Sequence, residues 1–394
     1  MASNKPLDIL TGWLLLLAMT SCAPAGSLVE IGSIGPVQEV FNYQHDRCVV
    51  WDAPDTPARA IRTSTGEIRL FAANDANRPL VGPDFDHLSK SCFVPFIGSA
   101  NPHPEGFDGQ AWLSAFYTED GLTVHALVHN EVHVADSTCK PDRSAACWRN
   151  TITYAVSKDG GHSFRQPLPP DNVVAALPYR FDHVADRPNR PTGYFNPTNI
   201  VRFRGMFYAL FLAEPEAAQR HGACLIRTAN LADPKSWRGW DGADFTIRFV
   251  DPYREQALIP DQHVCTPVGI GSLDFAMHSL VFHQPSGQFF ALMANRRPAT
   301  PDRPQGIYLA RSSDLINWSE PSLLLAASTS EKQPGGCASA LFLEANLIDH
   351  ASIDRSFSVI GNEAWLYLNR YNLHDCRITD DRDLVRRQIT FNSR

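Results

Sequence analysis

Residues 196–214 read NPTNIVRFRGMFYALFLAE: an apolar strand, a turn at Gly205 and an aromatic-rich strand that leads away from it. The same pattern occurs five times, with turn glycines at intervals of 55, 84, 82 and 74 residues; they are Gly66, Gly121, Gly205, Gly287 and Gly361. Repetition of a β-hairpin at a long spacing is typical of propellers and other repeat arrays. The repeat therefore indicates an all-β protein built from five related units.

Three of the units continue into a third strand, which ends on an Asp- or Asn-containing turn and an aromatic residue. These stretches are TITYAVSKDGGHSF (151–164), ACLIRTANLADPKSW (223–237) and GIYLARSSDLINW (306–318), and FTIRF (245–249) follows the second of them as a fourth strand. We expect the Asp and Asn side chains to accept hydrogen bonds from backbone amides, and the aromatic rings to pack between sheets. The pattern predicts a five-bladed β-propeller of four-stranded antiparallel blades, as a single domain over residues 40–394. The last unit needs the chain ahead of Pro57, or its own tail (384–391), to complete it.

Composition excludes some classes of function. The 394 residues are 44% hydrophobic and carry a formal net charge of −7, without a cluster of Lys and Arg. Such a chain has ample apolar material for a core but no basic surface for nucleic acid. We expect no cofactor and no metal-ligand set, although a structural ion in a central channel stays open, and we expect a monomer.

The first 25 residues predict an export signal. Lys5 precedes an apolar stretch, 9–19, that is too short to span a bilayer stably and is followed by small residues. Two kinds of processing fit: cleavage after the small residues 23–25, or lipid attachment at Cys22, because 19–22 (MTSC) resembles a bacterial lipobox. The expected location is periplasmic, outer-membrane-anchored or extracellular, with the lipid as the sole contact with a membrane.

Cysteine usage agrees with export. Apart from Cys22 there are eight cysteines: Cys48, Cys92, Cys139, Cys147, Cys224, Cys265, Cys337 and Cys376. An even number in an exported protein predicts disulfides. Their order favours pairs between neighbours, Cys139–Cys147 above all, although the sequence leaves the connectivity open.

Two motifs resemble those of known families. SKDGGHSF (157–164) is similar to the Asp-box turn of sialidases and other propellers, and SSDLINW (312–318) is similar to a strand-end motif of the five-bladed arabinanase- and invertase-type glycoside hydrolases. The resemblance covers residues 50–394 as a fold and implies a central carbohydrate-binding pocket. Because Asp-boxes lie at the periphery of blades, the motifs indicate the fold more strongly than the activity.

Candidate catalytic carboxyl groups stand where blades would open onto the pocket. Glycoside hydrolysis usually needs two carboxyl groups, an acid and a nucleophile or base. Asp55, which lies where the arabinanase-type enzymes have an aspartate, is the expected nucleophile or base, and Glu131 is the expected acid. Glu214 is the reserve acid, because Asn196 and Pro197 stand where the family resemblance implies a carboxylate.

The remaining candidates are expected to bind substrate; they are Arg59, His129, Asn130, Tyr194, Asn196, His278 and Arg370. Arg59, Arg370 and Arg227 are a candidate clamp for a sialic or uronic acid, although each could instead pair with a neighbouring Asp. One alternative function is a polysaccharide lyase that uses His129 or Tyr194 with arginines, and another is a glycan-binding protein without turnover. Carboxyl groups roughly 5 to 10 Å apart across an open pocket favour hydrolysis, whereas carboxylates locked in ion pairs favour the alternatives.

Overall fold

The computed structural model describes residues 1, 29–72, 74–134, 145, 147–181, 189–255, 259–296, 303–328, 332–333 and 335–393. Within these ranges the helical elements are short: α1 (Tyr43–Asp46) and the 3₁₀ turns Pro104–Gly106, Pro234–Ser236 and Pro260–His263. No helix of the described part is long and apolar enough to cross a membrane. Strands dominate the rest, so the prediction of an all-β protein is confirmed.

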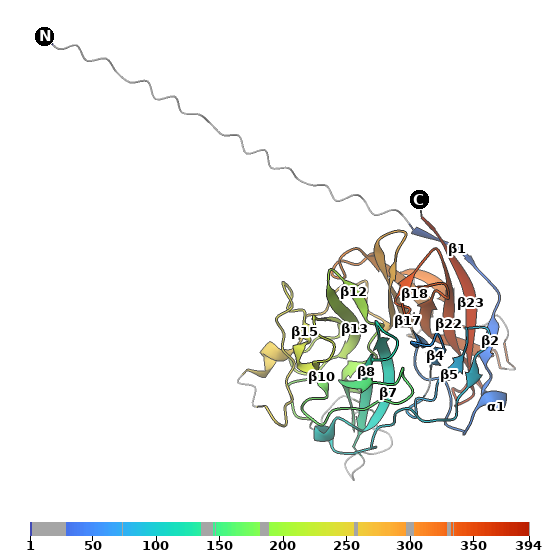
Figure 1. The fold of residues 1–394 in the computed structure, drawn as a ribbon, viewed down its shortest axis with the longest axis horizontal. Coiled ribbons are helices and arrows are strands. Elements are labelled where there is room, and N and C mark those ends of the chain that lie inside the picture. The colour runs from blue at the N-terminus through green and yellow to red at the C-terminus, as the bar shows by residue number, and fades with distance from the viewer. Residues whose placement is uncertain are drawn as a thin grey trace.

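The strands form five consecutive antiparallel groups, which follow one another around the molecule from blue to red in Figure 1. Group one is β3 (Arg59–Arg62), β4 (Ile68–Phe71), β5 (Leu80–Gly82) and β6 (Ser89–Lys90). Group two is β7 (Gln110–Tyr117), β8 (Val124–His133), β9 (Trp148–Ser157) and β10 (Val173–Ala175). Group three is β11 (Thr192–Phe195), β12 (Val201–Phe203), β13 (Met206–Glu214), β14 (Gly222–Thr228) and β15 (Arg238–Gly239).

Group four is β16 (Ala276–His283), β17 (Gln288–Asn295), β18 (Gly306–Ser312) and β19 (Ser322–Ala326). Group five is β20 (Ala340–Ile348), β22 (Glu363–Asn372), β23 (Arg382–Ser393), β1 (Val29–Ile34) and β2 (Gln38–Phe41). Short parallel pairings link neighbouring groups: β9 pairs with β11, which makes groups two and three one nine-stranded sheet, and β21 (Val359–Ile360) pairs with β16.

The glycine turns lie where the repeat predicts them, between the paired strands of each group. Gly121 shows why one of them needs glycine. Its φ of 71° is a conformation that other residues rarely adopt, and a Cβ there would lie 2.5 Å from the backbone of Thr63 in group one. The predicted fourth strand at 245–249 is wrong, because β15 takes that place and Ile247 makes only an isolated bridge to Gly239.

Both ends of the chain complete group five. β23 is the C-terminal tail, and β1 and β2 from ahead of Pro57 pair with it antiparallel. Val29 lies opposite Ser393, and Gln38 lies opposite Arg386. The chain therefore uses both of the segments proposed for the last unit, and its two ends hold one sheet together.

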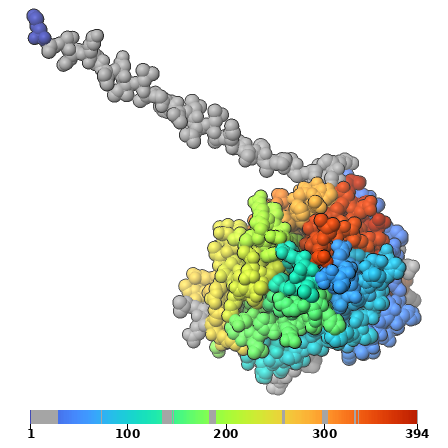
Figure 2. All heavy atoms as spheres, viewed as in Figure 1, coloured from blue at the N-terminus to red at the C-terminus, as the bar shows by residue number. Residues whose placement is uncertain are grey.

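Five apolar clusters fill the spaces between consecutive groups, and the colours in Figure 2 meet in the same order around the molecule. Group one packs on two, two on three, three on four, four on five and five on one. One buried member of each cluster, in that order, is Leu113, Phe211, Phe289, Leu366 and Leu70. Because the fifth interface returns to the first group, the groups form a closed ring.

The turns that end the third strands have the structural role expected of them. Asp159 accepts a hydrogen bond from the Ser163 amide at 2.9 Å, and Asp314 accepts one from the Ile316 amide at 2.9 Å. The ring of Phe164 then packs at 6.2 Å from that of Phe71 in group one. These motifs therefore stabilise contacts between groups.

Arg59, on the first strand of group one, is buried and links three groups. Its guanidinium donates to the Ser114 carbonyl of group two at 2.9 Å and to the His278 carbonyl of group four. Burial lowers its pKa to about 9. Asn346 of group five adds a further link, because its amide donates to the Ala58 carbonyl at 2.6 Å. Hydrogen bonds of this kind hold the innermost strands in register with one another.

Disulfides join neighbouring cysteines, as predicted: Cys48–Cys92, Cys224–Cys265 and Cys337–Cys376. Cys139 lies outside the described residues, as do 2–25 of the predicted export signal and Cys22. Structural disulfides are consistent with an exported protein. Cys48–Cys92 fastens the segment that leads to Asp55, and Cys337–Cys376 fastens the loop between β22 and β23.

Replacing Arg59 by Met should lower the free energy of unfolding by at least about 2 kcal/mol. The change leaves two buried carbonyls without donors, and each costs roughly 1–3 kcal/mol. Urea unfolding followed by tryptophan fluorescence measures the effect. Arg202→Met is the control, because Arg202 is 54% exposed and pairs with an exposed Glu119, so its loss should cost under about 0.5 kcal/mol. Equal losses in the two variants would contradict the linking role of Arg59.

Candidate active site

Asp55 lies in the loop that leads into β3. Its backbone amide donates to the Ala72 carbonyl at 3.2 Å, and its carboxylate pairs with Arg382 at the start of β23. The side chain keeps 31% of its surface exposed. Burial raises the pKa of Asp55 to about 6, helped by the charges of Glu344 and Glu131 and opposed by Arg382. Asp55 is thus a carboxyl group that keeps its proton to a higher pH than an ordinary aspartate does.

Glu131, near the end of β8, has the opposite electrostatic environment. Its two carboxylate oxygens lie 2.7 Å from Nε2 of His129 and 3.1 Å from Nε2 of His133. The backbone amide of Asn196 donates to Nδ1 of His129 at 3.2 Å. In the neutral ring, Nε2 therefore carries the hydrogen and donates it to Glu131. Burial alone would raise the pKa of Glu131, but the bonds to the two histidines outweigh burial and lower it.

Glu344 is a third carboxylate, and it occupies an irregular point of β20. The register of β20 shifts between Leu343 and Asn346, and Glu344 has a φ of 52°, which is unusual for a residue with a side chain. Its carboxylate pairs with Arg296 and lies 3.4 Å from Nε2 of His278. Burial would raise its pKa, but His278 and Arg296 lower it on balance. A strained, buried carboxylate of this kind is characteristic of functional sites.

His278 is held in the same way as His129. The Ala345 amide of group five donates to its Nδ1 at 3.1 Å, which directs Nε2 towards Glu344. Burial lowers the pKa of His278 to about 4, so its ring is neutral at pH 7. In both pairs a backbone amide of the next group fixes the tautomer of a histidine, and that histidine faces a carboxylate.

Tyr371 connects the two arginines of the site. The guanidinium of Arg382 lies over its ring, 4.7 Å from the centroid, and Arg296 interacts with it electrostatically. Burial raises the pKa of Tyr371, and the nearby charges of Glu344 and Asp55 raise it further. The hydroxyl is therefore protonated at neutral pH and can act as a donor or acceptor of hydrogen bonds.

The structure brings several of the predicted residues together. Asp55 and Glu131 interact electrostatically, His129 binds Glu131, and the Asn196 amide binds His129. His278 adjoins Glu344, which puts it in the same cluster. These residues come from groups one to five in turn, which is why no short stretch of sequence contains the site.

Other predicted residues lie apart from the cluster. Tyr194 is fully buried and donates to Gln219 at 2.8 Å, and Asn130 is fully buried, with its amide 3.3 Å from the Gln110 carbonyl. Neither side chain reaches a position from which it could contact a bound sugar. The lyase alternative therefore loses Tyr194 as a base.

The arginine clamp is likewise not assembled. The guanidinium of Arg59 donates to backbone carbonyls, whereas that of Arg370 pairs with Asp383 at 2.6 Å. Arg227 lies over the ring of Phe245 in group three. Each arginine binds partners of its own, in line with the structural alternative for these residues.

Glu344, Arg296, Arg382 and Tyr371 join the site without having been given a role from the sequence. Arg296 directly follows β17 and Tyr371 is next to last in β22, so position near a strand end indicates both, whereas Glu344 lies within β20 at its shift in register. Arg382 gave no such signal, because it lies ahead of the apolar run of the C-terminal tail. Only the return of that tail to group five brings it to Asp55.

A pocket of about 270 Å³ adjoins this cluster. It lies between groups three and four, and Arg296 belongs to both the pocket and the cluster. Its other lining residues include Glu214, the predicted reserve acid, which lies 3.4 Å from Nδ1 of His221. Among the described residues no group of three or more His, Cys, Asp or Glu side chains is arranged to hold a metal ion.

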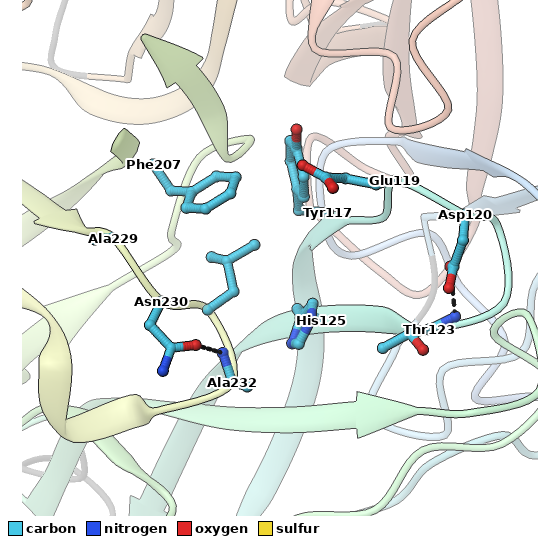
Figure 3. Close-up of a pocket in the computed structure, with 10 residues that line it drawn as sticks. Tyr117, Glu119, Asp120, Thr123, His125, Phe207, Ala229, Asn230 and Ala232 are labelled. Atoms are coloured by element: carbon cyan, nitrogen blue, oxygen red, sulfur yellow. Dashed lines mark hydrogen bonds between the residues drawn. The ribbon is translucent and has the colours of Figure 1, made fainter. Parts of the chain in front are cut away.

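A second pocket, of about 340 Å³, opens between groups two and three at the other end of the strands (Figure 3). Tyr117 and Phe207 line it. Tyr117 stands seven positions along β7 from Gln110, which pairs with Glu131. At about 3.3 Å per residue, the two ends of this stretch lie about 23 Å apart. Its Asp120 and Asn230 already accept hydrogen bonds from backbone amides of their own turns. This pocket is therefore separate from the carboxyl cluster.

Comparisons with known proteins give a likeness of fold. No family model and no curated protein matches the chain. Among solved structures it is similar to the Cellvibrio cellulosa α-L-arabinanase, with 12% identity over 85% of this chain and 91% of that one and a TM-score of 0.46. It is also similar to the Bombyx mori GH32 β-fructofuranosidase, with 12% identity over 91% and 65% and a TM-score of 0.47.

A third similar structure is the N-acetylgalactosamine deacetylase from F. plautii in complex with blood group B trisaccharide, with 10% identity over 91% and 95% and a TM-score of 0.46. At these identities and TM-scores no activity carries over to this chain, and its function depends on its own side chains.

Replacing His129 by Leu should raise the pKa of Glu131. The variant removes a hydrogen bond that favours the ionised carboxylate and leaves the effect of burial, which favours the protonated form. Carboxyl carbon NMR during a pH titration measures the shift directly. His125→Leu is the matched control, because His125 bonds Tyr154 near the other end of β8. An unchanged Glu131 pKa in His129→Leu, or an equal shift in the control, would show that His129 does not tune this carboxylate.

Proposed function

We propose that this protein is a five-bladed β-propeller that hydrolyses glycosidic bonds, exported and working in the periplasm, on the outer membrane or outside the cell. The five strand groups and their ring of apolar interfaces support the propeller. Three disulfides support export, and a lipid on Cys22 is the proposed link to a membrane. Its partner is an oligo- or polysaccharide, and it acts as a monomer.

The observation that supports hydrolysis is that the pKa values of neighbouring carboxyl groups are shifted in opposite directions. The pKa of Asp55 is raised to about 6, whereas the pKa values of Glu131 and Glu344 are lowered. Carboxyl groups pushed apart in this way can serve as acid and base in the same site. Glycoside hydrolysis needs one carboxyl group that donates a proton and one that stays ionised.

The assignment of roles is the reverse of that expected from the sequence. Asp55, whose raised pKa of about 6 keeps it protonated to a higher pH than an ordinary aspartate, donates its proton to the glycosidic oxygen as the bond to the leaving sugar breaks. Glu131, kept ionised by His129 and His133, acts on the sugar carbon as a nucleophile or takes a proton from the attacking water. His129 is a positioning residue, because it holds Glu131 and has no contact of its own with the reacting bond.

A glycan-binding protein without turnover is the second candidate, and one observation favours it. Each of the carboxylates of the cluster has a cationic or imidazole partner: Arg382 for Asp55, the histidines for Glu131 and Arg296 for Glu344. Such pairing suits a rigid set of hydrogen-bond acceptors for sugar hydroxyls. Hydrolysis is preferred because Asp55 keeps a raised pKa in spite of its arginine.

Asp55→Asn and Glu131→Gln should each lower turnover of a responsive glycan by about 100-fold or more, since each removes a proton donor or an ionised carboxylate. The assay is release of reducing sugar from a glycan panel, with circular dichroism as the check on folding. Asp120→Asn, in the distant pocket, is the control and should retain activity. Turnover that survives both site variants would rule out these roles. If the wild type binds glycans but releases no reducing sugar, the protein is a glycan-binding protein without turnover.

The pH dependence should follow Asp55 on the alkaline side. Activity needs Asp55 protonated, so it should fall about tenfold per pH unit above about 6, as this group ionises. Stability gives an independent check. The folded-state pKa of Asp55 is raised above its ordinary value of 3.8, so its contribution is present below that pH and is lost as pH rises through about 6.

Asp55→Asn lacks this loss. The melting temperature of the variant minus that of the wild type should therefore increase between pH 4 and pH 7. Differential scanning fluorimetry at a series of pH values measures the difference. A difference that stays flat with pH, or falls, would contradict the raised pKa of Asp55.

A further inference from the structure

We infer that the pocket between groups three and four binds one sugar unit that bears no carboxylate, beside the unit held at Asp55, and rejects a uronic acid there. The inference rests on the proposed function and names the class of substrate for the same site. The pocket measures about 270 Å³, at the lower limit of small-ligand pockets, and so suits a single ring.

The pocket is continuous with the carboxyl cluster through Arg296. This guanidinium lines the pocket, pairs with Glu344 and interacts electrostatically with Tyr371. Half of the Arg296 side chain (51%) remains exposed. A glycan bound at Asp55 can therefore extend its next unit past Arg296 without leaving the protein surface.

The lining combines apolar residues with acceptors of hydrogen bonds. The apolar residues are Leu212, Phe275, Ala276 and Ala294. The carboxylates of Glu214 and Asp274, which come from β13 and from the turn ahead of β16, line the same pocket. Such a lining fits a sugar ring, because the ring has C–H groups for the apolar residues and hydroxyl groups for the carboxylates.

The balance of charge decides between neutral and acidic sugars. Among the described lining residues, Arg296 is the one arginine or lysine, and Glu344 compensates its charge. Glu214 and Asp274 then leave this described lining negative, and its one imidazole, that of His221, lies 3.4 Å from Glu214.

The test uses binding, so that it does not depend on turnover. In the full mature chain carrying Asp55→Asn, isothermal titration calorimetry at pH 7 and low salt compares oligogalacturonides with their carboxyl-reduced counterparts, in which an uncharged hydroxymethyl group replaces each carboxylate. A glucuronate-containing pair and neutral arabino-, xylo- and galacto-oligosaccharides complete the panel. We expect the uncharged member of a pair to bind at least about 10-fold more tightly, and the preference to shrink in 0.5 M NaCl, which screens the repulsion.

Variants of the pocket sharpen the result. Glu214→Gln with Asp274→Asn, added to Asp55→Asn, should weaken binding of the neutral oligosaccharide and reduce the preference to about threefold or less. Glu119→Gln with Asp120→Asn changes the same number of charges at the distant pocket and should alter neither. The matched pair separates a local effect from a change of net charge.

Three results would overturn the inference: uronate ligands that bind as tightly as their reduced partners, a preference that the pocket variants leave intact, or no binding by any uncharged glycan of the panel. The proposed function fails separately. If the wild type cleaves no glycan while the binding preference holds, the hydrolase is lost and the pocket stands. If it cleaves glycans while the pocket variants change nothing, the hydrolase stands without this pocket.

Discussion

The pairing of the two chain ends in group five is the interaction on which the rest of the structure depends. Each strand group has an apolar face on both sides, and each face needs a neighbour. Groups one to four obtain theirs from the next group along the chain. In group five, β23 with β1 and β2 adds Val385 and Ile389 to the face towards group four, and Leu384 and Phe41 to the face towards group one. Closure then removes the last open interface, as it does in other cyclic sheet arrangements.

The site follows from this closure. Arg382 begins the closing strand and reaches Asp55, which precedes the first strand of group one, so the ion pair exists only in the closed ring. Glu131 and Glu344 depend on histidines whose tautomers are set by amides of the next group. The same contacts between groups that stabilise the fold therefore raise the pKa of one carboxyl group and lower the pKa values of two others.

The sequence carried the architecture because repetition is a local signal: each glycine turn with its flanking strands can be recognised alone. It also placed Asp55, Glu131, His129 and His278 near one another, since strand ends meet at one end of the ring. It could not assign their protonation, which depends on burial and on partners from other groups. Nor could the sequence predict that Arg382 reaches the site or that the side chains of Tyr194 and Asn130 are buried in the core. Whether a polar side chain near a strand end faces the pocket or the core depends on the strand register, which no single repeat determines.

The direction of β23 has a practical consequence. Arg382, at its start, lies beside the carboxyl cluster, whereas Ser393, at its end, lies opposite Val29, where β1 begins. Eleven residues of extended strand separate the two ends, or about 36 Å at about 3.3 Å per residue. A support coupled ahead of Val29 would therefore hold the molecule by the rim furthest from its carboxyl groups. Oriented attachment through that rim leaves the opposite face open to bulky polymers in solution.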